Sequence, residues 1–364
     1  MTAPHFKSIS IVGVGLIGGS FGLAIKKRFR HSRVIGFDKP SVLRRALQRK
    51  AIDAAASTLA EAAASDMVLL AMPINEIVRQ LPWLAPHVSP DTIVTDVGSV
   101  KSEIVATAAR IFPHGNFIGG HPMAGVELTG IDAAHPLLFE NAVYVLTPVS
   151  TTHRDKLQRL ADFLHALGAR VMVLDAKVHD RVASAVSHLP QLTAVALMNV
   201  VGKKHEEAAK HLNLAAGGFR DLTRIASSKF DIWKDILQSN AVEIDAALKM
   251  FIEELESYRK SIKSQPDQLE SEFTSSRALR IRIPKTMKGF LYPLSDIFVF
   301  VKDKPGQLAK ITSLLGESEL NIKDIEVVKV REGTGGTFRL SFANDAEKDF
   351  AKRILEKSGF EVAS

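Results

Sequence analysis

A glycine-rich turn near the N-terminus is the feature that most constrains the fold of this chain. The apolar stretch Ile9–Val12 runs directly into the sequence GVGLIG at Gly13–Gly18, and a helix-like segment over Ile17–Lys27 follows. A strand, a GxGxxG turn and a helix in this order are typical of dinucleotide-binding folds, in which the helix N-terminus faces a pyrophosphate. A purely structural strand–turn–helix unit is the alternative.

Each residue of the turn has its own expected part in cofactor binding. Gly13 permits the tight turn, Gly15 lets the pyrophosphate approach the backbone, and Gly18 lets the helix pack on the strand. Leu16 and Ile17 lie between these glycines at the start of the helix, so they are predicted to border the cofactor as well.

Two further positions are predicted to contact the cofactor. Asp38 ends the second predicted strand, 20 residues after the third glycine (38 − 18). A carboxylate there accepts hydrogen bonds from the adenine ribose and repels a 2′-phosphate, which favours NAD over NADP, although Lys39 beside it weakens the preference. A plain helix N-cap is the alternative for Asp38. Met72 and Pro73 end a later strand, where a loop borders the cofactor or simply ends the strand.

The first half of the chain alternates short apolar strands with helix-like segments. This alternation predicts a Rossmann-type α/β domain over residues 1–175, with a parallel, doubly wound sheet. The predicted strands are Ser8–Val12, Val34–Phe37, Met67–Ala71, Thr92–Thr95, Asn116–Ile118, Ala142–Leu146 and Val171–Leu174. The predicted helices include Ile17–Lys27, Ser41–Arg49, Asn75–Leu84 and Lys101–Ile111.

Helical patterns replace the strands from about Ala176. His179–Val201 and Trp233–Tyr258 are apolar at helical spacing, which predicts an all-α domain over residues 176–275 that binds substrate. Because long apolar helices commonly pack against a second subunit, a homodimer is expected. The polar segment Ser261–Ser276 indicates a helix that passes into a linker, placed at residues 276–295.

The last segment, residues 296–364, has a separate βαββαβ order. This order is typical of a small α+β domain with its helices on one face of a sheet. The predicted strands are Ile297–Val301, Ile322–Val330, Phe338–Phe342 and Phe360–Val362, and the predicted helices are Gly306–Leu315 and Ala346–Ser358.

Composition narrows the chemistry. The sequence has no cysteine, which excludes disulfides, thiolate catalysis and cysteine-ligated metals, and no metal site is predicted. No run approaches the roughly 18 apolar residues of a membrane span, and the N-terminus lacks a signal-peptide pattern, so a cytoplasmic location is expected. The net charge of +7 comes without a recognition helix or an aromatic ladder. An anionic small substrate is therefore favoured over nucleic acid.

Candidate catalytic residues follow two predicted strands. Ser99 belongs to the sequence DVGSVK at Asp96–Lys101, between a strand and a helix. His121 belongs to FIGGHPMAG at Phe117–Gly125, read as a glycine-rich turn from which a side chain can project into a cleft. A histidine there can accept a hydroxyl proton while hydride leaves the same carbon. A structural histidine in a turn is the alternative.

Two later segments carry candidate binding residues. His188 lies in the sequence SHLP within an apolar helix, where a buried core histidine is the alternative. Arg224 lies in GGFRDLTRIA, and its guanidinium can grip a carboxylate through two parallel hydrogen bonds. Asp221, three positions earlier, could orient Arg224. A surface ion pair is the alternative for these two residues.

Taken together, the motifs GLIGGS, DVGSVK, GGHPMAG, SHLP and GGFRDLTRIA strongly resemble the prephenate/arogenate dehydrogenase family, over about Ile9–Tyr258. The segment Asp296–Val362 is similar to an ACT domain through its Asp303–Leu308 turn and Asn321–Ile322. The resemblance implies NAD-dependent oxidative decarboxylation of prephenate to 4-hydroxyphenylpyruvate in tyrosine biosynthesis. It also implies feedback inhibition by tyrosine.

The resemblance implies a role for each candidate residue. His121 matches the catalytic histidine that hydrogen-bonds the ring hydroxyl, and Ser99 matches a serine near that hydroxyl and the nicotinamide. Arg224 matches the arginine that binds a substrate carboxylate, with Asp221 in support. His188 matches a histidine that lines the substrate pocket.

Other positions are implied at the edges of the substrate site and in the tail. Glu127 matches an acidic residue at the pocket mouth. Gln191 and Val126 depart from the family pattern, since many members have histidine and threonine there, and both could alter substrate or inhibitor preference. In the ACT-like tail, Gly306 and Asn321 are expected to bind the effector.

Three other functions fit part of the pattern. An arogenate dehydrogenase differs only in an amino group in place of the keto group on the substrate side chain. A β-hydroxyacid dehydrogenase shares the cofactor fold but leaves the GGHP and FRDLTR segments unexplained. A non-catalytic ligand sensor is disfavoured by the intact GxGxxG turn, His121 and Arg224.

Overall fold

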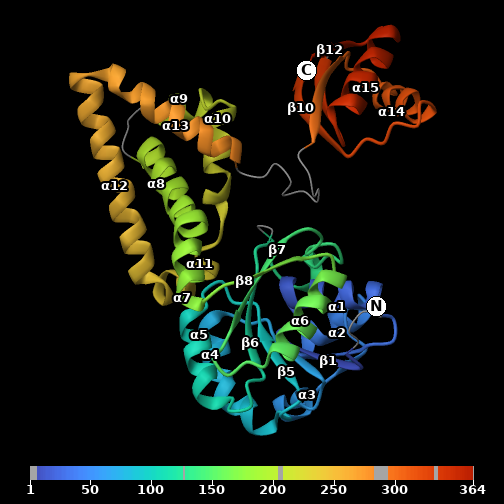
Figure 1. Cartoon of the computed structure of the whole chain (residues 1–364), viewed down its shortest axis with the longest axis vertical. Helices are drawn as coiled ribbons and strands as arrows, with labels where there is room; N and C mark the ends of the chain where they lie inside the picture. The colour runs from blue at the N-terminus through green and yellow to red at the C-terminus, as the bar shows by residue number, and fades with distance from the viewer. Residues whose placement is uncertain (1–5, 126–127, 204–207, 283–293, 332–334, 364) are drawn as a thin grey trace. The chain divides into compact units, whose positions relative to one another are not determined.

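The computed structural model describes residues 6–125, 128–203, 208–282, 294–331 and 335–363 (Figure 1). It divides into two compact units, Met1–Leu269 and Glu270–Ser364. The first unit contains an α/β part and a helical part. The second contains most of helix α13 (Leu269–Arg282) and a small antiparallel sheet with two further helices.

The α/β part is built on an eight-stranded sheet with the order β3-β2-β1-β4-β5-β6-β7-β8. Its strands are β1 (Ser8–Val12), β2 (Arg33–Phe37), β3 (Ala54–Ala55), β4 (Met67–Leu70), β5 (Ile93–Asp96), β6 (Phe117–Pro122), β7 (Val143–Pro148) and β8 (Arg170–Val173). The first six strands in this order are parallel to one another, as in a Rossmann fold.

The expectation of a wholly parallel sheet is wrong at one place. β7 pairs with β6 antiparallel, and β8 then runs parallel to β7. Between β6 and β7 the described residues form only a short 3₁₀ turn, η2 (Ile131–Ala133), and no crossover helix. A parallel neighbour needs such a crossover, whereas a chain that turns back without one pairs antiparallel.

Helices cover both faces of this sheet (Figure 1). They are α1 (Leu16–Arg28), α2 (Pro40–Gln48), α3 (Leu59–Ala63), α4 (Ile74–Leu84) with the short turn η1 (Ala85–His87), α5 (Ser102–Ile111) and α6 (Arg154–Ala166). One buried core joins the sheet to α1, α2 and α6, and a second joins it to α3, α4 and α5. The doubly wound architecture predicted from the alternating pattern is confirmed.

The helical part follows β8. Its elements are α7 (Ala176–Ala183), the π-helical turn η3 (Ser184–His188), α8 (Leu189–Lys203), α9 (Ala208–Asn213), α10 (Gly217–Thr223), η4 (Arg224–Ser227), α11 (Phe230–Ser239), α12 (Ala241–Ser264) and η5 (Pro266–Gln268). In η3 the backbone N–H of Leu189 donates to the carbonyl of Ser184, five residues back. Pro190 follows at once and has no N–H to continue the ladder, so a wider turn forms here.

The long helix predicted over Trp233–Tyr258 is in fact two helices. The chain breaks at Asn240, whose φ of −117° and ψ of 23° lie outside the helical range. The Asn240 side chain is buried and hydrogen-bonds two residues of the α7–η3 segment instead of solvent. This contact holds the helix junction against the part of the chain that carries the candidate site.

One helical run among the described residues, Ala176–Gly202, is long and apolar enough to cross a membrane by length and composition. Three of its polar side chains, His179, Asp180 and His188, are buried and hydrogen-bonded within the first unit. The run therefore serves as a helix of the folded unit, and much of its apolar surface is left uncovered there.

The second unit confirms the predicted βαββαβ order. Its strands are β9 (Ser295–Val301), β10 (Asp324–Arg331), β11 (Gly335–Phe342) and β12 (Glu361–Ala363), and its helices are α14 (Gln307–Glu317) and α15 (Asp345–Lys357). The sheet is antiparallel with the order β10-β11-β9-β12, and both helices pack into one core with it. Helix α13 (Leu269–Arg282) precedes this domain and covers residues 276–282 of the expected linker, while residues 283–293 lie outside the described chain.

Candidate active site

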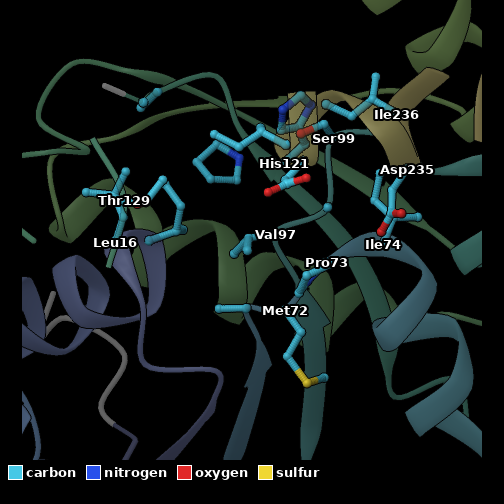
Figure 2. A pocket seen from close by; sticks show the side chains of 18 of the residues that line it. Leu16, Met72, Pro73, Ile74, Val97, Ser99, His121, Thr129, Asp235 and Ile236 are labelled. Carbon is cyan, nitrogen blue, oxygen red and sulfur yellow. The ribbon is translucent and has the colours of Figure 1, made fainter. Parts of the chain in front are cut away.

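A cavity of about 500 Å³ lies where the carboxyl ends of the parallel strands meet α11, and we call it the central cavity. Figure 2 shows His121 and Ser99 near one another, with Met72 and Pro73 below them. The lining residues are Leu16, Ile17, Ala71, Met72, Pro73, Ile74, Val97, Gly98, Ser99, His121, Pro122, Ala124, Gly125, Leu128, Thr129, Gly130, Asp231, Ile232, Asp235 and Ile236. Six of the residues predicted from sequence therefore converge here, from four separate segments.

His121 reaches this cavity from a strand and not from the turn that was expected. β6 continues through His121 to Pro122, because these residues pair with Val145 and Tyr144 of β7. The side chain is buried, and its Nδ1 atom lies 2.8 Å from Nε2 of His179 on α7. The strand fixes the backbone of His121 and a neighbouring helix fixes one nitrogen of its ring.

His179 is held in turn by the next residue along its helix. Its Nδ1 lies 2.8 Å from Oδ1 of Asp180, and both side chains are buried. The Asp180 carboxylate also accepts hydrogen bonds from the backbone N–H groups of Lys101 (2.7 Å) and Ser102 (2.8 Å) at the start of α5. The result is a continuous chain from His121 through His179 to a carboxylate at a helix N-terminus.

Asn240 supports the same chain of residues from the other side. Its Nδ2 donates to the backbone carbonyl of Asp180 at 2.9 Å and lies 3.2 Å from Nδ1 of His188. His188 is buried and packs edge-on against Trp233, with the ring centroids 6.0 Å apart. His188 is not among the residues that line the central cavity or the cavity beside Trp233, so its expected place in the substrate pocket stays a prediction.

A buried ion pair contacts β6, the strand that carries His121. The Lys101 ammonium contacts the Asp96 carboxylate and donates to the carbonyl of Gly120 at 2.8 Å, and all the side-chain surface of both residues is buried. Asp96 accepts the backbone N–H groups of Gly98 (2.8 Å) and Gly120 (3.0 Å). The pair thus ties the loop that carries Ser99 to the residue next to His121.

The electrostatic surroundings keep His121 and His188 uncharged at neutral pH. Burial lowers the pKa of His121 well below its ordinary value, and the neighbouring His179, Lys101 and His188 lower it further. Burial lowers the pKa of His188 to about 4, although Asp180 opposes the shift. Burial alone would raise the pKa of Asp180, but the hydrogen bonds from His179, Ser102 and Lys101 outweigh it and the net shift is downward. At neutral pH a neutral His121 can therefore accept a proton, and it is joined through His179 to an ionised Asp180.

A second cavity of about 820 Å³ adjoins the first, and we call it the dinucleotide cavity. Its lining residues are Val12, Gly13, Gly15, Phe37, Asp38, Lys39, Ala71, Met72, Pro73, Asn75, Glu76, Gln80 and Asp235. Four of these residues, Ala71, Met72, Pro73 and Asp235, line the central cavity as well. The two cavities together form one path from Asp38 to His121.

The glycine turn fits a dinucleotide. Gly13 has a φ of +94°, and a Cβ there would lie 2.5 Å from the carbonyl oxygen of Ala71, whereas a Cβ on Gly18 would lie 2.0 Å from that of Gly13. Gly15 instead faces open space, and it caps α1 without any side-chain hydrogen bond. Gly13 and Gly18 therefore serve close packing, while the backbone N–H groups in the first turn of α1 can bind a pyrophosphate.

Asp38 lies at the far end of this cavity. One carboxylate oxygen accepts the backbone N–H of Val14 at 2.7 Å, and the other accepts that of Lys39 at 2.6 Å. Each oxygen keeps a lone pair for a further donor. Asp38 is thus oriented by the glycine turn and can accept hydrogen bonds from ribose hydroxyls.

A third cavity of about 420 Å³ contains Arg224, and we call it the outer cavity. Its lining residues are Gly125, Val186, Ser187, Pro190, Gln191, Arg224, Ile225, Ser228, Ile232 and Trp233. Gly125 and Ile232 line the central cavity too, so the two spaces adjoin. Arg224 can therefore bind the charged end of a molecule whose other end lies beside His121.

The other predicted site residues have different positions. Asp221 is exposed on α10, and within the described chain no hydrogen bond or ion pair joins it to Arg224. Glu127 lies outside the described residues, as does Val126. In the second unit, Gly306 has a φ of +86° and lines a small cavity of about 190 Å³ with Asp303 and Leu308, whereas exposed Asn321 does not line it.

Sequence reasoning missed several residues of the site. His179, Asp180 and Asn240 were taken as parts of apolar helices, and Lys101 was quoted only as part of a motif. Asp235 was also missed, although it joins α11 to α4 by accepting a 2.8 Å hydrogen bond from the Asn75 side chain. The available signal was a pair of ionisable residues, His179–Asp180, in an otherwise apolar segment.

Comparison with known families gives three matches along the chain. Residues 21–173 match the family model described as the nucleotide-binding domain of prephenate dehydrogenase, and residues 175–274 match the model of its dimerization domain. Residues 295–354 match the ACT domain.

Individual proteins agree with these matches. The prephenate dehydrogenase of Bacillus subtilis is 33% identical over 354 residues, which is 96% of this chain and 95% of that protein. The crystal structure of the Aquifex aeolicus enzyme with hydroxyphenyl propionate and NAD+ is similar with a TM-score of 0.72 and 29% identity, covering 77% of this chain and 99% of that one. Synechocystis arogenate dehydrogenase has a TM-score of 0.67 and 33% identity, covering 76% and 99%.

Proposed function

The chain belongs to the prephenate dehydrogenase family and ends in an ACT domain, and from this we propose that it oxidatively decarboxylates prephenate to 4-hydroxyphenylpyruvate with NAD as oxidant. One observation carries the choice of reaction. Uncharged, buried His121 lies between a cavity suited to a dinucleotide and a cavity that contains Arg224. This order suits a dianionic substrate with a hydroxyl at one end and carboxylates at the other.

In the proposed mechanism the chain binds, orients and deprotonates the substrate. Arg224 binds a carboxylate in the outer cavity, which directs the ring hydroxyl toward His121 and Ser99 in the central cavity. His121 accepts the hydroxyl proton on its free ring nitrogen. The apolar side chains of Leu16, Ile17 and Met72 line this cavity and exclude water from the ring.

NAD, when bound, supplies the acceptor for the hydride that leaves the hydroxyl-bearing ring carbon. The ring carboxylate departs as carbon dioxide, and the electrons of the broken carbon–carbon bond complete an aromatic ring. The proton held by His121 can return to the phenolic oxygen or pass to solvent. Aromatisation drives the decarboxylation, so the protein's task is alignment and one proton acceptor.

The substrate can be identified by absorbance at 340 nm, the band of the reduced nicotinamide. We expect turnover of prephenate with NAD, and lower kcat/KM with NADP because Asp38 repels a 2′-phosphate. Arogenate is the second candidate, because Gln191 lines the outer cavity where many family members have histidine. Higher kcat/KM for arogenate than for prephenate would reassign the substrate, and turnover of a simple 3-hydroxyacid alone would contradict the proposed function.

We also propose that the enzyme is a cytoplasmic homodimer formed through its helical part. The family model that matches residues 175–274 is a dimerization domain. The helical part exposes a series of large apolar side chains that a second copy could cover. They include Val186, Leu214, Leu222, Phe230, Val242, Met250 and Ile262, each more than 60% exposed.

Tyrosine is the proposed effector of the ACT domain, through the cavity beside Gly306. We expect tyrosine to inhibit the full chain and to inhibit much less a chain that ends at Leu294, before β9. A coupling of about 1–3 kcal/mol is usual between linked sites. Turnover and inhibition should be measured on both chains, with sedimentation as the control that both are dimers. Equal inhibition of an active shortened chain would show that tyrosine acts at the active site.

A further inference from the structure

The buried pair His179–Asp180 has no part in the chemistry described so far, yet it contacts the ring that takes the proton. His121 has two ring nitrogens, and only an unprotonated one can act as a base. Nδ1 is committed to the 2.8 Å contact with His179, so Nε2 is the nitrogen left for a substrate in the central cavity. The position of the ring proton therefore decides whether His121 can act as a base toward the substrate.

Hydrogen-bond donors and acceptors determine that position. The Asp180 carboxylate can only accept, so Nδ1 of His179 must carry a proton to make its 2.8 Å bond. When both rings are neutral, Nε2 of His179 is then bare and can only accept from His121. Nδ1 of His121 must be the donor, and its Nε2 is left unprotonated.

We propose that His179 and Asp180 are positioning residues that hold His121 in the tautomer with its proton on Nδ1 and a free lone pair on Nε2. When Nε2 takes the substrate proton, the charge on His121 is stabilised through His179 by the Asp180 carboxylate, without any transfer of the proton to Asp180. The proposal relies on the proposed function only for the identity of the substrate.

Asp180 is suited to this part because its other contacts keep it ionised and in place. Its oxygens accept two backbone N–H groups at the start of α5, where the helix dipole also favours negative charge. The same two bonds hold α7 against the loop that carries Ser99. One carboxylate thus orients the base through His179 and anchors the segment next to Ser99.

Substitutions at His179 separate this role from simple packing. We expect His179→Phe, which fills the space without any hydrogen bond, to lower kcat by about 10²–10⁴-fold, the range for a lost general base, with little change in KM. His179→Gln should recover much of the loss, because its amide oxygen can accept from Nδ1 of His121. His165→Phe is the control, since His165 is an exposed histidine on α6 whose ring Nδ1 contacts the Ala169 carbonyl, and it does not line the cavities described above.

The tautomer itself can be read without substrate. ¹⁵N spectra of the full-length enzyme with labelled histidine should show His121 protonated on Nδ1 and bare on Nε2, with its signals identified by their loss in His121→Asn. A proton on Nε2 of His121 in the wild-type enzyme would overturn the proposal, even if prephenate proves to be the substrate. Wild-type kcat in His179→Phe would also overturn it. If the spectrum is as expected but the enzyme does not turn over prephenate, the proposed substrate is refuted and the proposed role of His179 and Asp180 is not.

The pH profile is a further readout that packing alone would not move. The charged or titratable groups around His121 are His179 and Asp180 on α7, Lys101 before α5, Asp96 at the end of β5, His188 in η3, Tyr144 on β7, and Asp231 and Asp235 on α11. A proton on Nε2 of His121 disables the base, so kcat/KM falls at acid pH as His121 is protonated. The contact with His179 lowers the pKa of His121, so His179 influences where that fall, the acid limb of the profile, lies. His179→Phe should move that limb and His165→Phe should not. If kcat/KM of His179→Phe falls at the same acid pH as that of the wild-type enzyme, the proposal is contradicted.

Discussion

Replacing His121 with asparagine is expected to lower kcat for prephenate by about 10²–10⁴-fold, the usual contribution of a general base. Asparagine keeps a polar group beside His179 but has no nitrogen that can accept a proton at neutral pH. KM should change much less, because Arg224, the proposed carboxylate-binding residue, lies in the outer cavity. Steady-state kinetics at saturating NAD measure both constants, and His114→Asn, at an exposed position before β6, is the matched control.

The pH dependence of the wild-type enzyme gives an independent check on His121. Only the neutral ring is a base, so kcat/KM should be constant at neutral pH and fall as the pH drops through the pKa of His121. Burial lowers that pKa, so the fall should come well below the ordinary histidine value of about 6.5. An unchanged kcat with a raised KM in His121→Asn would make His121 a binding residue and refute the mechanism.

Replacing Arg224 with alanine is expected mainly to raise KM for prephenate. Losing one partner of a buried charged hydrogen bond costs about 2–5 kcal/mol, or roughly 30- to 4,000-fold in binding. Arg224 is exposed in the single chain, so solvent screens it and the lower part of this range is expected. The measurement is KM and kcat for prephenate, with the affinity for NAD as the internal reference.

Two further variants decide what Arg224 does. Arg224→Lys should recover little of the substrate binding that is lost in Arg224→Ala, because an ammonium cannot form two parallel hydrogen bonds to a carboxylate. Arg220→Ala removes an exposed arginine that does not line the central or outer cavity, and it should leave KM near the wild-type value. Unchanged KM in both Arg224 variants would show that Arg224 makes a structural ion pair and does not bind the substrate.

Local patterns in the sequence were sufficient for the cofactor half of the site. Gly13 and Gly18 are dictated by backbone geometry within one turn, and Asp38 follows at the end of the next strand. The βαββαβ order of the tail is local in the same sense, since each element shows its own period of apolar residues. Elements whose residues contact near neighbours in the chain can therefore be recognised from the sequence pattern alone.

The site around His121 depends on contacts between distant parts of the chain. His121 lies 58 residues from His179, Lys101 lies 79 from Asp180, and Asp180 lies 60 from Asn240. A buried polar residue shows no period of its own, so His179 and Asn240 looked like parts of apolar helices until their partners were in place. The break between α11 and α12 at Asn240 was missed for the same reason, because the hydrogen-bond partners of Asn240 lie far away in the sequence.

The sequence by itself therefore determined the order of domains and the dinucleotide turn, and it identified His121 as the candidate proton acceptor. Only the tertiary structure decided that β7 returns antiparallel, that His121 projects from a strand, and that His179 and Asp180 lie behind it. The physical reason is that the proton position on a buried imidazole depends on which groups surround it. Those groups come together only when α7 packs against β6 and the start of α5.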